Sequence, residues 1–82
     1  MAAKKLRVEQ LDILGMLRTF SSTGLSVQEI LVQAGGVGLA ITKERIQEIL
    51  REFARLHLVT YEMVVAEYRY YLSEKGAKRI DG

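Results

Sequence analysis

Side chains able to recognise nucleic acid stand close together in the middle of the chain. Lys43, Arg45, Gln47 and Arg51 all belong to one segment, TKERIQEILREFAR at residues 42–55. An arginine can donate two hydrogen bonds to one guanine, and a glutamine can pair with adenine in the same way. A lysine can hold a backbone phosphate. This segment is therefore a candidate for contacting base edges and phosphates.

Two carboxylates bear on this interpretation. Glu44 and Glu48 fall on the same outward side of the segment as Arg51, and carboxylates repel phosphates. A glutamate can nevertheless accept a hydrogen bond from the amino group of cytosine, so acidic residues do not exclude DNA. The alternative is a solvated helix face of mixed charge. We favour a DNA contact and count Glu44 and Glu48 among its candidate residues.

Further basic residues could follow the phosphate backbone. Lys4 and Lys5 stand near the start of the sequence, and Arg69 lies in a predicted strand. Such cations add affinity through counterion release without reading the base sequence. We include all three as candidate DNA contacts, with ordinary solubilising charge as the alternative for the terminal cluster. The net charge of +2, from 12 basic and 10 acidic side chains, neither requires nor excludes nucleic acid.

Other chemistries have weaker signals. The chain has no cysteine, which excludes disulfides and thiolate metal sites. His57 is the only histidine, and a metal site or catalytic triad needs several partners. Gly35, Gly36 and Gly38 lack the preceding strand and the Gly-Lys-Ser/Thr ending of a phosphate-binding loop. We therefore predict no enzymatic activity and no cofactor, and we assign these glycines to a turn with positive φ.

Hydrophobic periodicity predicts a first helix over about residues 8–20. Leucines at helical spacing, among them Leu11 and Leu14, should face inward. Val8 and Met16 fall on the other side of the helix. They are either scattered surface hydrophobes, which are common, or a dimer contact along this helix.

Two more helices have clear start signals. Ser26 and Glu29 form a capping box for the second helix, and Thr42 caps the third. The third helix carries one apolar stripe, formed by Ile46, Ile49, Leu50 and Phe53. This stripe should pack inward and turn the candidate DNA-contacting side chains outward.

The periodicity then changes from 3.6 to 2, which predicts two strands over residues 60–65 and 68–72. Most of the tyrosines in these strands should pack, with one exposed. The turn near Ala66-Glu67 has no glycine, so we expect something other than an ideal two-residue type I′ loop. Leu25 is expected to add one short strand pair.

From residue 26 to residue 80 the chain resembles small winged helix-turn-helix regulators of the MarR, ArsR and PadR-like groups, including archaeal and archaeal-virus relatives. The resemblance rests on Thr42-Lys43, Ile46, Leu50-Arg51-Glu52-Phe53, Leu58-Val59 and LSEKG at residues 72–76. It implies an α+β, mainly α fold: a single winged helix-turn-helix domain over residues 1–82, with three helices and a two- to three-stranded wing sheet.

Three features depart from that family pattern. The loop GGVGLAI between the second and third helices is longer than the usual turn. His57 stands where these families often have glycine. The wing has one basic residue, Arg69, which argues against its insertion into the minor groove.

The resemblance implies sequence-specific binding of double-stranded DNA by a transcriptional regulator whose third helix enters the major groove. The alternative is a winged-helix protein-protein interaction module in a replication, transcription or membrane-remodelling complex. We also expect a cytoplasmic homodimer with no membrane segment and no small-molecule ligand. The absence of asparagine and cysteine is typical of a thermophilic source.

Overall fold

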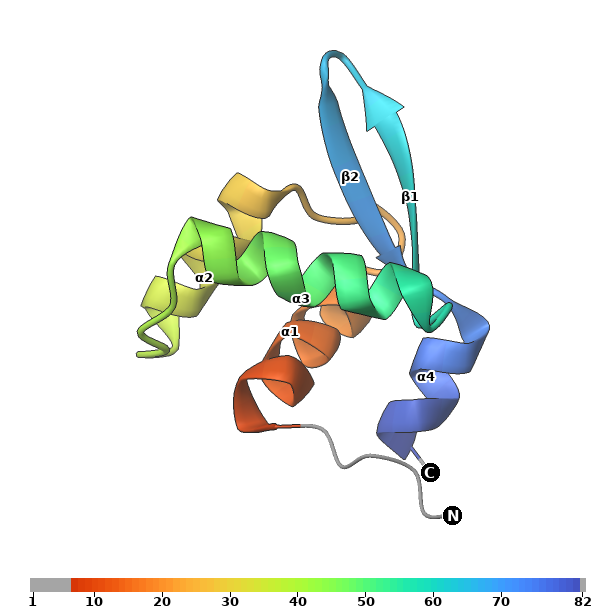
Figure 1. The fold of residues 1–82 in the computed structure, drawn as a ribbon, viewed down its shortest axis with the longest axis horizontal. Helices are drawn as coiled ribbons and strands as arrows, with labels where there is room; N and C mark the ends of the chain where they lie inside the picture. The colour runs from red at the N-terminus through yellow and green to blue at the C-terminus, as the bar shows by residue number, and fades with distance from the viewer. Residues whose placement is uncertain (1–6, 82) are drawn as a thin grey trace.

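The computed structural model describes residues 7–81, and Figure 1 shows helices grouped into a body from which one β-hairpin projects. The elements in chain order are α1 (Val8–Thr19), α2 (Val27–Gly36), α3 (Lys43–Arg55), β1 (Val59–Val64), β2 (Glu67–Leu72) and α4 (Glu74–Asp81). The predicted three helices and hairpin are confirmed, and α4 follows them. Among residues 7–81, no helix has both the length and the apolar character needed to cross a lipid bilayer.

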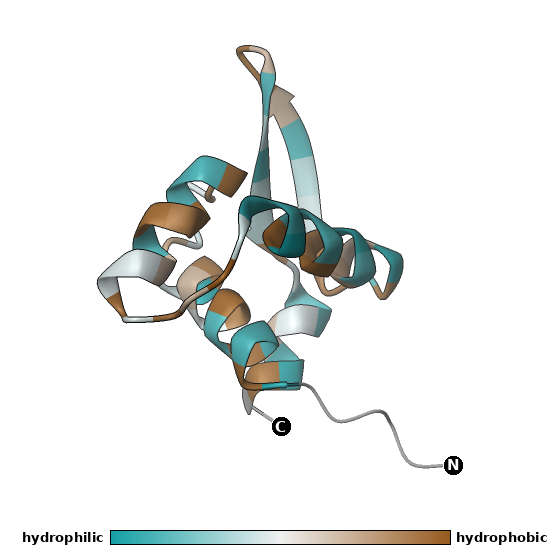
Figure 2. Ribbon diagram, turned by 60° about the vertical axis from the view of Figure 1, so that its left-hand side comes forward, coloured by the Kyte–Doolittle hydropathy of each residue, from teal (hydrophilic) through white to brown (hydrophobic). Residues whose placement is uncertain are grey.

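One hydrophobic core joins the helices. The apolar stripe predicted for α3 is fully buried, and in Figure 2 hydrophobic residues recur along one side of that helix. Each such large side chain stabilises the fold by about 1.5–3 kcal/mol when it leaves water. The fully buried large side chains are Ile13, Leu14, Leu17, Ile30, Ile46, Ile49, Leu50 and Phe53. Burial of this stripe leaves the opposite side of α3 facing outward.

The buried face of α1 differs from the predicted one. Leu11, expected inside, is 44% exposed, whereas Met16, expected outside, is only 9% exposed and belongs to the core. The reason is that α1 packs against α2, β2 and α4, so its buried arc is wider than one stripe and is rotated away from Leu11. Val8 is exposed as expected.

The start of α2 confirms the predicted capping box. The Ser26 hydroxyl accepts a hydrogen bond from the Glu29 backbone N–H at 3.2 Å, and the Glu29 carboxylate accepts one from the Ser26 N–H at 2.9 Å. At the other end, α2 continues through Gly35 and Gly36. Of the three loop glycines, Gly38 alone has a positive φ, at 76°.

A left-handed residue ends α3. His57 has a φ of 62°, and its N–H donates to the Ala54 carbonyl at 3.1 Å. The N–H of Leu58 donates to the Phe53 carbonyl at 2.8 Å. These two bonds define a Schellman motif, in which glycine is the usual left-handed residue. The motif turns the chain directly from α3 into β1.

The hairpin turn differs from the prediction. The strands pair in antiparallel register from Val59 with Leu72 to Val64 with Glu67, so the loop has only two residues. These are Val65 and Ala66, with φ values of 47° and 64°. Both central residues therefore have the positive φ of a type I′ turn, despite the lack of glycine. At the base, buried Val59 lies opposite partly buried Leu72 and fixes the register. The turn residues must adopt the backbone that this register requires.

The base of the hairpin is attached to the helical body. Leu25 forms an isolated antiparallel bridge with Tyr70, as predicted. Gly24, with a φ of 69°, lies so close to the hairpin that a Cβ atom there would stand 2.6 Å from the Tyr71 ring. On the other side, a Cβ atom at Gly76 of α4 would stand 2.1 Å from the Leu58 carbonyl oxygen. Glycine is therefore needed at both contacts.

Candidate nucleic-acid interface

The outward face of α3 carries most of the side chains singled out from the sequence. The Thr42 hydroxyl accepts a hydrogen bond from the Arg45 N–H at 3.1 Å and caps the helix. Lys43, Glu44, Glu48 and Arg51 are exposed, and Gln47 is half-buried. The start of a helix has backbone N–H groups without partners inside the helix, and these groups can stabilise a phosphate. The structure therefore brings Lys43, Gln47 and Arg51 onto one accessible helix.

Arg45 lies on the same helix but is bound to carboxylates of the protein. Its Nε atom donates to a Glu9 carboxylate oxygen of α1 at 2.9 Å, and its guanidinium also pairs with Glu48. Hydrogen bonding to Glu9 raises the pKa of Arg45 above its ordinary value. Arg45 thus ties α3 to α1.

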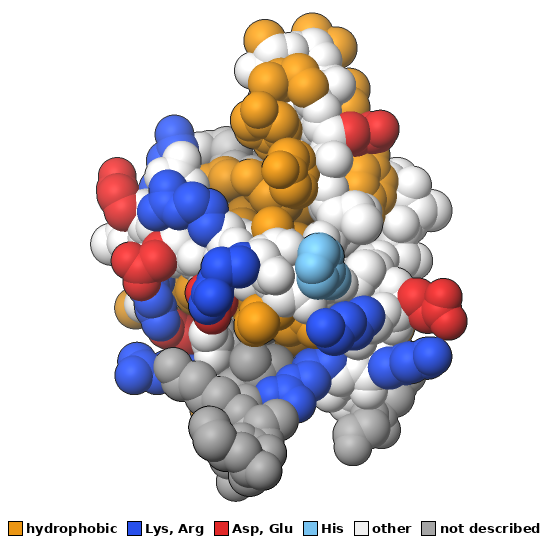
Figure 3. Space-filling model, turned by 45° about the vertical axis from the view of Figure 1, so that its right-hand side comes forward, with side chains coloured by type: hydrophobic (Ala, Val, Ile, Leu, Met, Phe, Trp, Pro, Cys, Tyr) orange, Lys and Arg blue, Asp and Glu red, His pale blue; other side chains and the backbone are white. Residues whose placement is uncertain are grey.

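The charges of α3 differ in how far they are neutralised. Within residues 7–81, neither Lys43 nor Arg51 forms an ion pair. Arg55, one turn beyond Arg51, pairs with Glu52 at 2.5 Å. Figure 3 shows charged side chains of both signs interspersed over the helical body. Lys43 and Arg51 therefore differ from Arg45 and Arg55 of the same helix, which are held by carboxylates of the protein.

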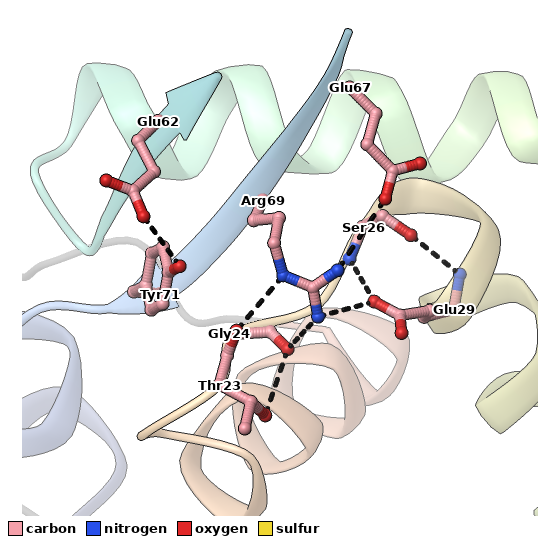
Figure 4. Close-up of polar contacts among 8 residues, drawn as sticks. All are labelled: Thr23, Gly24, Ser26, Glu29, Glu62, Glu67, Arg69 and Tyr71. Atoms are coloured by element: carbon pink, nitrogen blue, oxygen red, sulfur yellow. Dashed lines mark hydrogen bonds and ion pairs between the residues drawn. The ribbon is translucent and has the colours of Figure 1, made fainter. Parts of the chain in front are cut away.

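Arg69 holds the hairpin against the body, as Figure 4 shows. Its side chain is only 20% exposed and donates to the backbone carbonyls of Thr23 at 3.1 Å and Gly24 at 3.0 Å. It also pairs with Glu29 of α2 at 2.8 Å and with Glu67 at 3.6 Å. The guanidinium is thus occupied by the loop before α2 and by the start of α2. Lys4 and Lys5, the remaining candidates, lie outside the described residues.

The hairpin exposes apolar side chains, among them two of the tyrosines, where the sequence analysis expected one exposed tyrosine. Tyr61 and Met63 are each 56% exposed, Val65 at the tip is 93% exposed, and Tyr68 is also exposed. Tyr61 and Tyr68 meet edge to face with ring centroids 5.5 Å apart. Hydrophobic side chains gather over this projection in Figure 3, and the tip is brown in Figure 2. Tyr70, near Arg51, is half-buried, and burial raises its pKa.

The described residues show no arrangement for metal chemistry. Between residues 7 and 81, no group of histidine, cysteine, aspartate and glutamate side chains could hold a metal ion. His57, the one histidine in the sequence, ends α3 through its left-handed backbone and its N–H, which bonds to Ala54.

Solved structures with the same arrangement of elements identify the fold. MepR of Staphylococcus aureus, a transcription regulator of the multidrug efflux pump MepA, matches with a TM-score of 0.79 and 23% identity over 94% of this chain and 54% of that chain. This chain has a winged helix-turn-helix fold. In it, α2 and α3 form the helix-turn-helix, and β1 and β2 form the wing.

Two further winged-helix matches are informative. The S. aureus MepR–DNA complex has a TM-score of 0.74 and 22% identity, over 93% of this chain and 52% of that chain. The iron-containing ferric uptake regulator of Francisella tularensis has a TM-score of 0.77 and 13% identity, over 90% of this chain and 57% of that chain. The chain therefore spans about half the length of the solved proteins that it matches. No family model and no curated protein sequence matches it.

Proposed function

We propose that this chain is a transcriptional regulator that binds double-stranded DNA by inserting α3 into the major groove. The observation that carries the proposal is the outward face of α3, where Lys43 and Arg51 stand exposed without ion pairs among residues 7–81. The shared fold with the MepR–DNA complex supports the same orientation. In this fold the residues near the start of the recognition helix, which is α3 in this chain, approach base edges.

The outward residues of α3 would make different kinds of contact with DNA. Gln47 is placed to recognise a base edge, Arg51 to contact a base or a phosphate, and Lys43 to hold a phosphate near the helix start. Glu44 and Glu48 remain candidates for accepting hydrogen bonds from cytosine. These side chains together would give α3 both base-specific contacts and phosphate contacts.

Arg45 reaches DNA in this proposal only by exchanging its partners. Ion pairs on a protein surface stabilise weakly, because water and salt screen them. A bidentate contact between arginine and guanine is stronger than such a pair. A guanine at a cognate site would therefore have to replace the ion pairs of Arg45 with Glu9 and Glu48.

The remaining candidates act at the edge of the interface. Arg69 positions the wing through its contacts with Thr23, Gly24 and Glu29. Lys4 and Lys5 would follow the backbone as a basic arm. We further propose that the regulator acts in the cytoplasm as a homodimer, without an enzymatic step or a small-molecule ligand.

Titration of a fluorescent random duplex at several salt concentrations tests this proposal. If about five phosphates are neutralised per protomer, log affinity should fall with log salt at a slope of roughly −4 to −5. Lys43→Ala should make the slope shallower by about one, since one phosphate contact is lost. Lys75→Ala, a matched exposed lysine on α4, should leave it unchanged. An absence of duplex binding at low salt would refute the proposal.

Base readout needs a separate measurement on a selected site and a scrambled duplex. Gln47→Ala should lower the discrimination between the two by about 1–3 kcal/mol, whereas Lys43→Ala should weaken both equally. Equal effects of these two variants on both duplexes would contradict readout by α3.

The second candidate function is a protein-protein interaction module. The exposed apolar side chains of the wing favour it, because large exposed apolar patches mark interaction surfaces. Wing residues Tyr61, Met63, Val65 and Tyr68 make up this patch. Salt-insensitive or absent DNA binding would favour this alternative.

A further inference from the structure

Three tyrosines project from one face of the wing. In the antiparallel register Tyr61 lies opposite Tyr70, and Met63 lies opposite Tyr68. Side chains directly opposite each other, and those two positions apart along a strand, share one face of a sheet. Tyr61, Met63, Tyr68 and Tyr70 therefore form one surface, which we call the tyrosine face.

Two of the rings are accessible and are held by their neighbours. Tyr61 is 56% exposed and Tyr68 is 47% exposed. Their rings meet edge to face, and the Tyr61 ring also lies 5.9 Å from that of Tyr70 between centroids, inclined by 40°. Tyr70 is half-buried and packs against the core, so this cluster is anchored to the helical body. A tyrosine ring held in this way offers a large contact surface and loses little conformational entropy on binding.

Cations of α3 border the tyrosine face. Burial raises the pKa of Tyr70, and the positive charge of Arg51 acts in the opposite direction, so Arg51 lies near this ring. Arg51 is exposed and forms no ion pair in the described part of the chain. Lys43, Gln47 and Arg51 are spaced four residues apart, so they form one row along α3. Figure 3 shows the hydrophobic side chains of the hairpin above lysine and arginine side chains of the helical body.

The carboxylates of the wing lie on its opposite face. Glu62 lies opposite Arg69 in the register, and Glu67 stands two positions before Arg69, so all three project away from the tyrosine face. The Glu62 carboxylate accepts a hydrogen bond from the Tyr71 hydroxyl at 2.8 Å, and Glu67 pairs with Arg69 at 3.6 Å. Negative charge is thereby kept from the tyrosine face. An apolar protein partner is indifferent to this separation of charge, whereas a polyanion that carries flat rings benefits from it.

We propose that the tyrosine face binds single-stranded DNA, with bases stacked on Tyr61 and Tyr68 and with phosphates held by Arg51. Proteins that bind single strands combine aromatic rings, on which bases stack, with positive charge that follows the backbone. Unpaired bases can stack on side chains because their faces are free. The carboxylates of the wing could accept a hydrogen bond from a ribose 2′-hydroxyl, but they lie on the other face, so the tyrosine face favours deoxyribose. Stacking does not read base edges, so this site is separate from duplex recognition by α3.

Fluorescence anisotropy with a labelled oligothymidylate of about eight nucleotides tests the proposal, because this strand cannot pair with itself. An abasic strand of the same length carries the same phosphate charge without bases. Oligothymidylate should bind at least about tenfold more tightly than the abasic strand, since stacking contributes to its affinity. Equal affinities would show that phosphate contacts alone hold the strand, and tighter binding of oligouridylate would contradict the assignment to DNA.

Substitutions at Tyr61 separate ring stacking from apolar contact. Tyr61→Leu should weaken the binding of oligothymidylate at least about fivefold, whereas Tyr61→Phe keeps the ring and should bind within about twofold of the wild type. Tyr71→Leu is the matched control, because Tyr71 lies on the opposite face of the same wing, and it should have no effect. Circular dichroism confirms that the variants are folded.

Two results would overturn the proposal and favour a protein partner for the tyrosine face. One is the absence of oligothymidylate binding by the wild-type protein, and the other is equal binding by Tyr61→Leu and Tyr61→Phe. The duplex titration proposed above is a separate measurement. A protein that binds oligothymidylate through Tyr61 but does not bind a duplex would refute only the proposed function, and the converse would refute only this inference.

Discussion

Replacing His57 with glycine should stabilise the protein, because this residue is held at a φ of 62°. For an L-residue the left-handed region costs roughly 1–2 kcal/mol, and glycine avoids this cost. Glycine also loses about 0.5–1 kcal/mol more conformational free energy on folding. The net gain should be about 0.5–1 kcal/mol, which raises the Tm of a domain of this size by roughly 2–8 °C. The His57 side chain is exposed, so the change isolates the backbone.

A series of substitutions at this position separates backbone strain from side-chain effects. The free energy of unfolding, measured by urea denaturation, should be highest for His57→Gly, followed by His57→Asn and then the wild type. His57→Val should unfold about 1–2 kcal/mol more easily than the wild type, because a β-branched residue tolerates positive φ poorly. Ala54→Gly is the control: it lies within α3 at helical φ, so glycine there should cost about 1 kcal/mol. Equal stability of the glycine and valine variants at position 57 would refute the reasoning.

Two other predictions concern the wing and α2. The double change Val65→Asn and Ala66→Gly should stabilise the hairpin by about 1–2 kcal/mol, because both positions have positive φ and Asn-Gly suits a type I′ turn. Amide hydrogen exchange in β1 and β2 should become slower, and unchanged exchange would contradict the prediction. The backbone hydrogen bond from Ser26 lowers the pKa of Glu29 below 4.5. Because this folded-state pKa is depressed, its stabilisation is present above pH 4.5 and is lost as the pH falls through the folded-state value. Denaturation of Glu29→Gln between pH 3 and 6 should therefore depend less on pH than that of the wild type, and an unchanged slope would disprove the link.

The features predictable from the sequence were those set by neighbouring residues. The capping box of Ser26 and Glu29 and the buried stripe of α3 each depend on residues within a few positions of one another, so they follow from helical geometry alone. The type I′ turn at Val65 could not be predicted, because pairing of the two strands imposes its φ against its side-chain preference. The burial of Met16 likewise depends on which elements surround α1.

The residue types on the candidate interface could be predicted from the sequence, whereas their ion pairs could not. The type and spacing of Lys43 and Arg51 placed them correctly on the outward face of α3. The ion pairs of Arg45 with Glu9 and of Arg69 with Glu29 join residues far apart in the sequence. Such pairs depend on the packing of α1 and α2 against the other elements, and no local pattern indicates them. Pairing, rather than residue type, distinguishes a free cation from a structural one.

Under the proposed function, the rigid attachment of the wing constrains the shape of the bound duplex. Contacts through Arg69, the bridge at Leu25 and the close approach at Gly24 fix the wing relative to the helix-turn-helix. The protein then has little freedom to adjust the distance between α3 and the wing tip. A duplex contacted by both must supply the adjustment by bending or by changing its groove width, and the free energy of that deformation depends on base steps that no side chain touches. Flexible pyrimidine–purine steps between the two contacts should therefore be preferred.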